Sequence, residues 1–236
     1  KMAAVLNVGT LIQPTTKAQY LAKNVPLPPK LFSHNDQQSF WQSSTVEGAK
    51  SGWGGRMADL FLAQNNTPAV TAINAAGNAV FLTGRTASQY AVSSAGPIAL
   101  NGNARTLFGS AAGATALQSI IGATQGNLFG NELARTSGRA LTAYTQVSTA
   151  LTGGPTIATP FPTGNTLADQ LKVVARLIST SQELGAKRQV FFVSLGGFDL
   201  HSGLLATHPV LLGRVADAMR AFYDSTVELG VASRVT

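Results

Sequence analysis

The chain has 236 residues, of which 44% are hydrophobic and only 11% are charged. Because apolar content is high and charge is sparse, the composition excludes a disordered tail, and the absence of cysteine excludes a disulfide scaffold. The net charge of +7 comes from 17 basic and 10 acidic residues that are spread thinly along the chain. A nucleic-acid groove needs a cluster of basic side chains interleaved with aromatic ones, so we expect no nucleic-acid partner.

Lysines are most frequent near the N-terminus, where the first fifty residues hold five of them against Asp36 and Glu47. These are Lys1, Lys17, Lys23, Lys30 and Lys50. A solvated basic face is the favoured interpretation, and a weak attraction to anionic substrates or membrane surfaces stays open. The longest apolar runs, such as Val190 to Val193, are far shorter than the ~20 residues of a membrane helix, so we expect no stable membrane insertion.

The first half of the chain shows a weak pattern of secondary structure. An apolar run predicts a strand over residues 3–8, and a short helix is expected over 55–64. The segments 69–74 and 79–83 are expected to pair as a hairpin through the turn between them. Residues 87–126 are rich in Ala, Ser, Gly and Asn without a strong period, which indicates an insertion of loops and short helices.

The second half is more regular. Apolar spacing predicts helices over 131–151 and 166–184, separated by a Pro- and Gly-rich linker at 153–165. Residues 189–195 form a nearly continuous apolar run, as expected of an interior parallel strand. A further helix is expected over 207–229, with Thr207 as its cap and Pro209 in its first turn. Helix, strand, loop and helix in this order indicate an α/β fold with a mostly parallel central sheet flanked by helices.

The two ends of the chain are both expected to be strands, at 3–8 and from 231 onward. The interior strand at 189–195 is expected to lie beside one or both of them. A domain that opens and closes on core strands is expected to be a piece of a longer one. We therefore expect a single α/β domain over 1–236, incomplete at both ends.

The sequence from Gly196 to His201 is the strongest candidate for chemistry. Ligands in open α/β sheets bind beyond the carboxyl ends of the strands, and here a strand is followed by Asp199 and His201. A carboxylate and an imidazole are ordinary ligands of Zn²⁺ and similar ions, so Asp199 and His201 are candidate metal ligands. The alternative is a tight turn, with Asp199 bonded to local amides and His201 on the surface.

Ser33 stands where a helix is expected to begin, with Asp36 three residues later. One interpretation is a plain helix cap. The other adds catalysis, because a serine in the positive field of a helix N-terminus suits a phosphate or sulfate ester and could act as the nucleophile. The neighbouring His34 is a candidate for binding that anionic ester.

Arg56 follows the glycine-rich sequence Gly52-Trp53-Gly54-Gly55. Its planar guanidinium suits an oxyanion, and the glycines would let the loop close around a substrate. The alternative is that Trp53 packs in the core and Arg56 is a surface residue. His208 is expected to lie in a helical first turn and receives no role.

Three blocks of the chain, in the same order, resemble the bacterial DUF1501 proteins. They are Leu31 to Gln38, Gly52 to Arg56, and Val190 to His201, the last followed by Ala206-Thr207-His208-Pro209. The Gly-Gly-Phe-Asp-Xaa-His block is the most specific, and Leu200 replaces the family's usual threonine. The resemblance implies an alkaline-phosphatase-like or sulfatase-like fold with a two-metal site holding Zn, Mn or Ca. It matches Asp199 and His201 to metal ligands and Ser33 to the nucleophile.

The same resemblance implies that further family blocks lie before and after this chain. The two-metal site would then be complete only in the full-length protein, and this chain alone would be inactive. Family members are expected to be exported, so a periplasmic location follows as an expectation. Two functions stay open: a metal-dependent hydrolase of phosphate or sulfate esters, or a non-catalytic cell-envelope protein that binds or assembles, with a homo-oligomer open in either case.

Overall fold

The structure is a computed structural model that describes residues 8–45, 48–77, 79–99 and 106–236. In this part of the chain the sheet has four strands in the order β3-β2-β1-β4. They are β1 (Ala72–Asn74), β2 (Tyr90–Ser93), β3 (Gly96–Pro97) and β4 (Val190–Phe192). β1 pairs in parallel with both β2 and β4, whereas β2 and β3 are antiparallel. The expected α/β class is confirmed, and the sheet is mixed, with two parallel strand pairs and one antiparallel pair.

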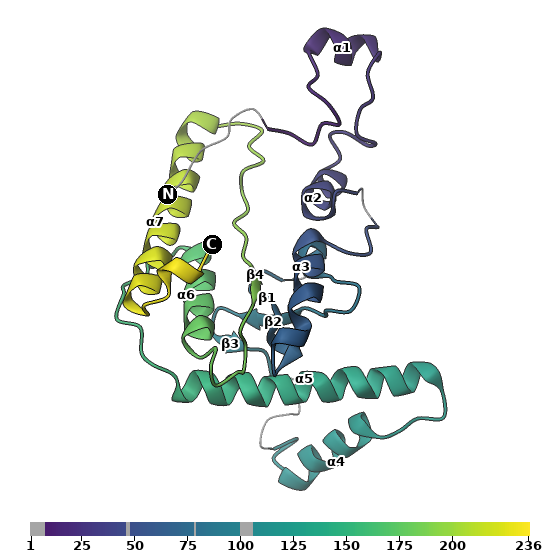
Figure 1. The fold of residues 1–236 in the computed structure, drawn as a ribbon, viewed down its shortest axis with the longest axis vertical. Coiled ribbons are helices and arrows are strands. Elements are labelled where there is room, and N and C mark those ends of the chain that lie inside the picture. Colours follow the sequence, from purple (N-terminus) through teal and green to yellow (C-terminus); the bar gives the residue numbers. More distant parts are fainter. Residues whose placement is uncertain (1–7, 46–47, 78, 100–105) are drawn as a thin grey trace.

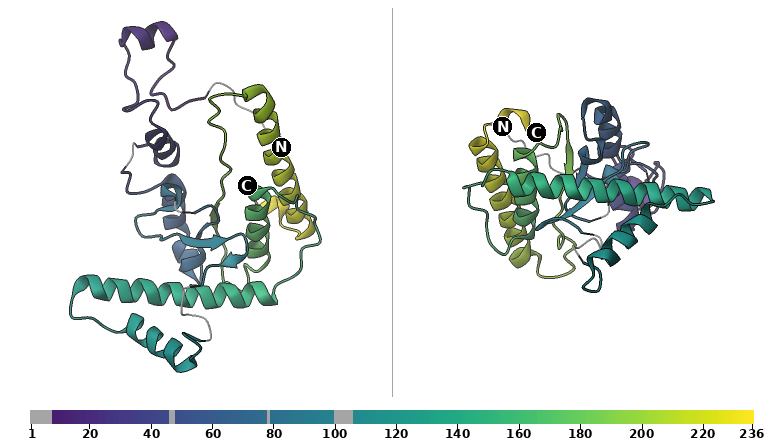
Figure 2. Two further views of the ribbon diagram at one scale, coloured as in Figure 1. Left: turned by 180° about the vertical axis from the view of Figure 1, so that it is seen from behind. Right: turned by 90° about the horizontal axis from the view of Figure 1, so that it is seen from below.

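Helices flank this sheet on both sides (Figures 1 and 2). The α-helices are α1 (Lys17–Ala22), α2 (His34–Ser43), α3 (Trp53–Phe61), α4 (Ala111–Gly122), α5 (Leu128–Gly153), α6 (Thr166–Ser179) and α7 (Leu204–Glu228). Short 3-10 helices are η1 (Leu62–Gln64), η2 (Pro68–Val70), η3 (Val80–Leu82) and η4 (Ala232–Arg234). The helices predicted over 55–64, 131–151 and 166–184 are therefore present, with ends that differ by a few residues.

The core of the described residues has three clusters. One lies between α6 and α7. The other two lie on opposite sides of β1. On one side, Ile73 packs with apolar side chains of α5 and α6, including Val147 and Leu177. On the other, Ala72 packs with Ala58 of α3 and Leu82 of η3. Since all three residues of β1 are buried, β1 is the centre of the sheet.

The interior position predicted for residues 189–195 is wrong within the described residues. β4 spans only Val190–Phe192 and pairs with β1 alone, so it lies at an edge of the sheet. Of its two expected neighbours, residues 3–7 lie outside the described residues. The other, from residue 231, is the 3-10 helix η4, because Val231 donates back to Thr226 O (2.9 Å) and Arg234 to Val231 O (2.8 Å).

The expected hairpin of 69–74 with 79–83 is also wrong. Residues 80–82 form η3, in which Thr83 N donates to Val80 O (3.0 Å) and Phe81 N donates to the Gln42 side chain (3.0 Å). The backbone donors that a hairpin would use are therefore bonded elsewhere. In place of the hairpin, β1 pairs with β4 and with β2, and β2 lies inside the segment 87–126 that was expected to be loops and short helices.

Local features also set where two helices begin. α6 is capped by Asn165, whose side chain accepts hydrogen bonds from the N–H groups of Leu167 and Ala168. α7 begins at Leu204 with Gly203 at its cap position, so Thr207 is not the cap, and Thr207 and Pro209 both lie inside the helix.

Two parts project from this body (Figures 1 and 2). The first half of α5 extends beyond the sheet with α4 beside it. At the opposite end of the molecule, residues 8–32, which include α1, form a projecting loop that we call the arm.

Candidate metal site

The chain leaves β4 in an extended conformation that is held by one side chain of α6. The amide of Gln170 donates to Ser194 O (3.0 Å) and accepts from Ser194 N (2.9 Å). Gly197 follows with a φ of +92°, a conformation in which a side chain would be strained. These features carry the backbone past the carboxyl end of β4 and present Asp199 and His201 in solvent.

The second part of the candidate site lies at the start of α2. Ser33 caps this helix, with its hydroxyl accepting from Asp36 N at 3.4 Å. Asp36 is buried and lies 3.8 Å from Lys30 Nζ. His34 is the first residue of the helix, so its ring projects from the helix N-terminus.

The structure brings His34 to the loop after β4, although 165 positions separate it from Asp199. Nε2 of His34 lies 2.8 Å from Oδ2 of Asp199, and Nε2 of His201 lies 3.2 Å from the same oxygen. One ligand atom from each of the three residues lies within 4.8 Å of the others. We call His34, Asp199 and His201 the triad.

All three triad side chains are exposed, with exposed fractions of 66%, 63% and 82% in chain order. Hydrogen bonds from His201 and then His34 lower the pKa of Asp199, and the proximity of both rings adds to this effect. The carboxylate is therefore held in its ionised form, which is the form that binds a cation.

The donor set fits a divalent transition metal. Two imidazoles and one carboxylate, with further positions open, form the protein ligand set of catalytic zinc sites and of mononuclear non-haem iron sites. The same Nε2 atoms that now face the carboxylate would turn their lone pairs to the ion. Within the residues that the structure describes, this is the only group of three His, Cys, Asp or Glu side chains with such a geometry.

Arg56 does not join the triad. Its guanidinium donates to Ser43 O (3.5 Å) and to Ser51 O (3.3 Å), so it covers the carbonyl at the C-terminal end of α2. His34 is at the other end of this ten-residue helix, roughly 13 Å along the axis at 1.5 Å per residue. The glycines beside Arg56 also have a packing role, because a side chain at Gly52 or Gly55 would overlap the backbone of residues 80–84.

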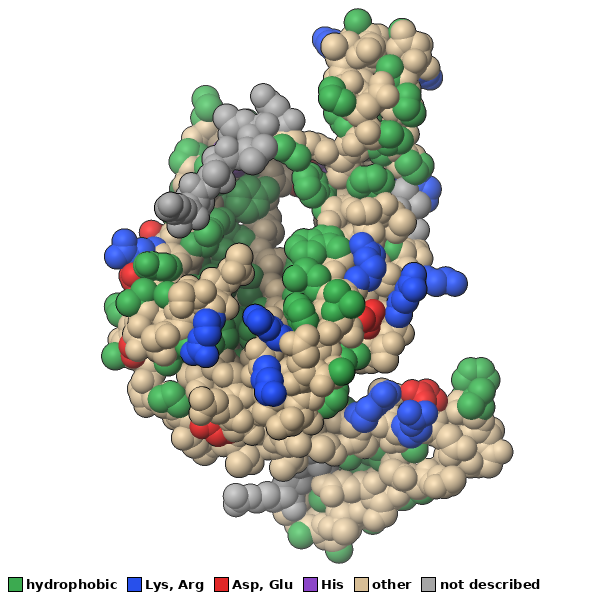
Figure 3. All heavy atoms as spheres, viewed as in Figure 1, with side chains coloured by type: hydrophobic (Ala, Val, Ile, Leu, Met, Phe, Trp, Pro, Cys, Tyr) green, Lys and Arg blue, Asp and Glu red, His purple; other side chains and the backbone are tan. Residues whose placement is uncertain are grey.

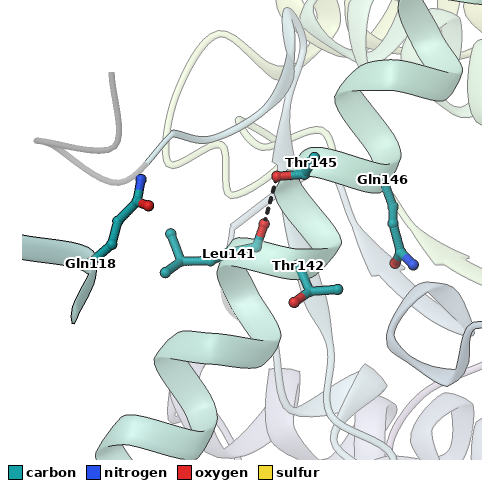
Figure 4. A pocket seen from close by; sticks show the side chains of 5 residues that line it. All are labelled: Gln118, Leu141, Thr142, Thr145 and Gln146. Carbon is teal, nitrogen blue, oxygen red and sulfur yellow. Dashed lines mark hydrogen bonds between the residues drawn. The ribbon is translucent and has the colours of Figure 1, made fainter. Parts of the chain in front are cut away.

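Two other features lie outside this group. His208 stacks edge-on against Phe198, with ring centroids 6.0 Å apart. A hollow of about 340 Å³ lies between α4 and α5 (Figure 4). The side chains that line it are uncharged: Gln118, Leu141, Thr142, Thr145 and Gln146. Because none of these groups is an acid, base or metal ligand near neutral pH, the triad is the better candidate for chemistry.

All three triad residues are candidates from the sequence, but His34 was expected to bind the anionic ester and not a metal ion. Asp199 and His201 are two positions apart, so their proximity follows from the sequence. The position of His34 depends on how α2 packs against η3 and α3, and no local pattern predicts that packing. The only signal was a histidine directly after the helix cap.

Comparisons of this chain with family models, curated proteins and solved structures found no match. Among the described residues, no helix has the length and apolar character needed to cross a membrane.

Proposed function

We propose that the protein is a metal-dependent hydrolase of phosphate or sulfate esters. The observation that carries this proposal is the convergence of His34, Asp199 and His201, with one ligand atom of each within 4.8 Å of the others. Membership of the DUF1501 family, an alkaline-phosphatase-like fold and a periplasmic location belong to the same proposal and rest on the three sequence blocks. A second metal ion would need ligands from outside the described residues.

His34, Asp199 and His201 would hold the ion. Two imidazole ligands favour Zn²⁺ or Mn²⁺ over Ca²⁺, which prefers oxygen. A bound divalent ion would supply positive charge for the ester oxyanion and an acidified hydroxyl or water. Ser33 precedes His34 at the positive end of α2, so its hydroxyl would serve as the nucleophile and the N–H groups of that end would suit an anion.

Metal binding is the first test, because it requires no turnover. We expect the 236-residue chain to bind Zn²⁺ in calorimetry with one ion per chain. Loss of a residue that only hydrogen-bonds to a metal ligand already lowers metal affinity about ten- to a hundredfold. Loss of a ligand itself, in His34→Gln, Asp199→Asn or His201→Gln, should therefore weaken Zn²⁺ binding by about a hundredfold or more. His208→Gln is the matched control, since His208 is the remaining histidine, and it should bind like the wild type.

Hydrolysis is the second test, run on this chain and on a longer form with the expected flanking blocks, because the chain alone is expected to be inactive. The substrates are nitrophenyl phosphates and sulfates in the presence of Zn²⁺ or Mn²⁺. Ser33→Ala should abolish turnover and keep the metal. Since this change also removes a helix cap, Ser110→Ala, which removes the equivalent cap of α4, controls for stability and should keep its rate. A chain that binds no metal would contradict the proposal, as would a Ser33→Ala variant with normal turnover.

The alternative proposal is a non-catalytic cell-envelope protein that binds or assembles through this surface. The observation that favours it is the exposure of the whole triad, because catalytic centres usually exclude water. Three results would together support this alternative. The chain would bind one metal ion, neither the chain nor a longer form would turn over any ester, and Ser33→Ala would behave like the wild type.

A further inference from the structure

The arm is fixed at its base and faces solvent elsewhere. Thr10 and Pro28, from its two sides, are buried. Together with Phe40 of α2 they line a gap of only about 10 Å³, which is too small for more than one water. α1, at the far end, buries no side chain, and Figures 1 and 2 show it standing away from the sheet and the large helices. The arm therefore projects into solvent from a base that packs against α2.

Local hydrogen bonds keep α1 folded without a core. Thr16 and Gln19 form a reciprocal capping box, with Thr16 N donating to Gln19 Oε1 at 2.9 Å and Gln19 N to Thr16 Oγ1 at 3.2 Å. Lys23 ends the helix in the left-handed conformation. Because these bonds alone define the helix, its side chains are left to face an outside partner.

Large apolar side chains are exposed along the arm. They are Val8, Leu11, Ile12, Tyr20, Leu21 and Phe32. Leu21 and Phe32 are the most exposed, at 66% and 69%, and Tyr20 meets Phe32 edge-on at 6.0 Å. Apolar groups gathered on one projecting element mark an interaction site more often than scattered ones do.

The charges of the arm have one sign. Residues 8–32 contain three lysines, Lys17, Lys23 and Lys30, and no Asp or Glu. Lys30 lies near the buried Asp36, whereas Lys17 and Lys23 flank α1 directly. Figure 3 shows the arm with green and blue side chains and no red ones on the face in view.

We infer that the arm docks on an anionic lipid surface, with its apolar side chains in the headgroup region and its lysines on acidic headgroups. Exposed apolar groups flanked by lysine alone are typical of segments that lie in a membrane interface. A protein partner is disfavoured because lysine is depleted from the centres of protein interfaces. The inference depends on the arm and not on the triad, so failure of one leaves the other standing.

The test is co-sedimentation of the 236-residue chain with vesicles of phosphatidylcholine, alone or mixed equally with phosphatidylglycerol. We expect binding to the mixed vesicles only, and weaker binding at high salt. Lys17→Gln with Lys23→Gln should lower affinity about 25-fold, at about fivefold per lysine. The control is Lys172→Gln with Lys187→Gln, two exposed lysines outside the arm, which gives the same net charge and should change binding far less.

A second pair of variants tests the apolar side chains. Ile12→Asn with Leu21→Asn should lose at least about tenfold in affinity with every lysine kept. The control, Leu128→Asn with Leu133→Asn, alters two leucines of α5 that are at least as exposed, and it should bind like the wild type. Equal losses in arm and control variants, or no binding to mixed vesicles, would overturn the inference. Binding to polyglutamate beads but not to vesicles would point to an acidic protein and overturn it too.

Discussion

The hydroxyl of Tyr90 is buried and has no hydrogen-bond partner among the described residues. Burial raises the pKa of Tyr90 to about 12, and the nearby Tyr144 adds to the effect. A buried unsatisfied hydroxyl costs about 1–3 kcal/mol, and a phenyl ring of the same shape avoids this cost. The hydroxyl therefore weakens the core that β2 shares with α5.

We expect Tyr90→Phe to raise the free energy of unfolding by about 1 kcal/mol in urea titrations. The folded protein holds the phenolic proton above the ordinary pKa of 10.0, so wild-type stability should fall as the pH rises from there toward about 12. The free energy of unfolding of Tyr90→Phe should fall less over this pH range. Tyr223→Phe, at an exposed tyrosine, is the control and should match the wild type. A destabilised Tyr90→Phe protein would mean that the hydroxyl is bonded.

Two carboxylates tie loops to helices through backbone N–H groups. Asp59 of α3 accepts from Arg85, Thr86 and Ala87, at 2.7–2.9 Å. Burial alone would raise its pKa, but these three bonds lower it below the usual 3.8. Glu228 of α7 accepts from the Thr159 hydroxyl at 2.5 Å and from the N–H groups of Ala158 and Thr159, and its pKa falls below 4.5.

Because both pKa values are lower in the folded state, the unfolded chain binds protons more tightly. The stability that these carboxylates contribute is complete above about pH 4.5 and is lost as the pH falls through the folded values. Asp59→Asn and Glu228→Gln should therefore lower Tm at pH 7 and flatten its fall between neutral and acid pH. Glu183→Gln, at an exposed glutamate, should leave the curve unchanged. If Tm fell with pH in the same way in all variants and in the wild type, this account would be contradicted.

At the scale of elements, α3 packs against the segment after η3 with no room for a side chain at one of its glycines. A side chain at Gly55 would overlap the carbonyl of Thr83 and the N–H of Gly84. Backbone cannot move aside as a side chain tip can, so Gly55→Ala should cost about 3 kcal/mol in chemical denaturation. Gly138→Ala in α5, where no other atom lies within 4 Å, should instead gain about 0.5–1 kcal/mol. Similar effects of the two substitutions would show that α3 does not need this contact.

How well each element could be predicted depends on its length and on where its hydrogen bonds go. The helix over 166–184 was recognised because Leu171, Val174 and Leu177 repeat on one face that packs in the core. β1 has only three residues, and the apolar residues Val80–Leu82 became a 3-10 helix because Gln42, a distant side chain, accepts from Phe81 N. Asp199 and His201 could be paired from sequence, whereas His34 needed the packing of α2.

At the scale of the whole molecule, burial is uneven. α6 buries seven of its residues, whereas the buried residues of α5 all lie from Ala143 onward and α4 buries only Ala114. Local opening is easiest where few apolar contacts must break. We expect hydrogen exchange to be slowest in α6, fast in α4 and in α5 before Ala143, and fastest in the arm. Uniform protection along α5 in mass-spectrometric exchange would contradict this expectation.

The sheet joins distant parts of the chain, and this sets the order in which the protein can fold. The Gln189 side chain donates to Val70 O across 119 positions, and β4 pairs with β1 in the same register. During synthesis, β1 therefore emerges long before β4. The edge of β1 that will pair with β4 stays without hydrogen-bond partners while α4, α5 and α6 are made. Parallel pairs between remote segments form slowly, because the whole intervening loop must be ordered first. The interval before β4 arrives is the time when this chain is most prone to aggregate and most in need of a chaperone.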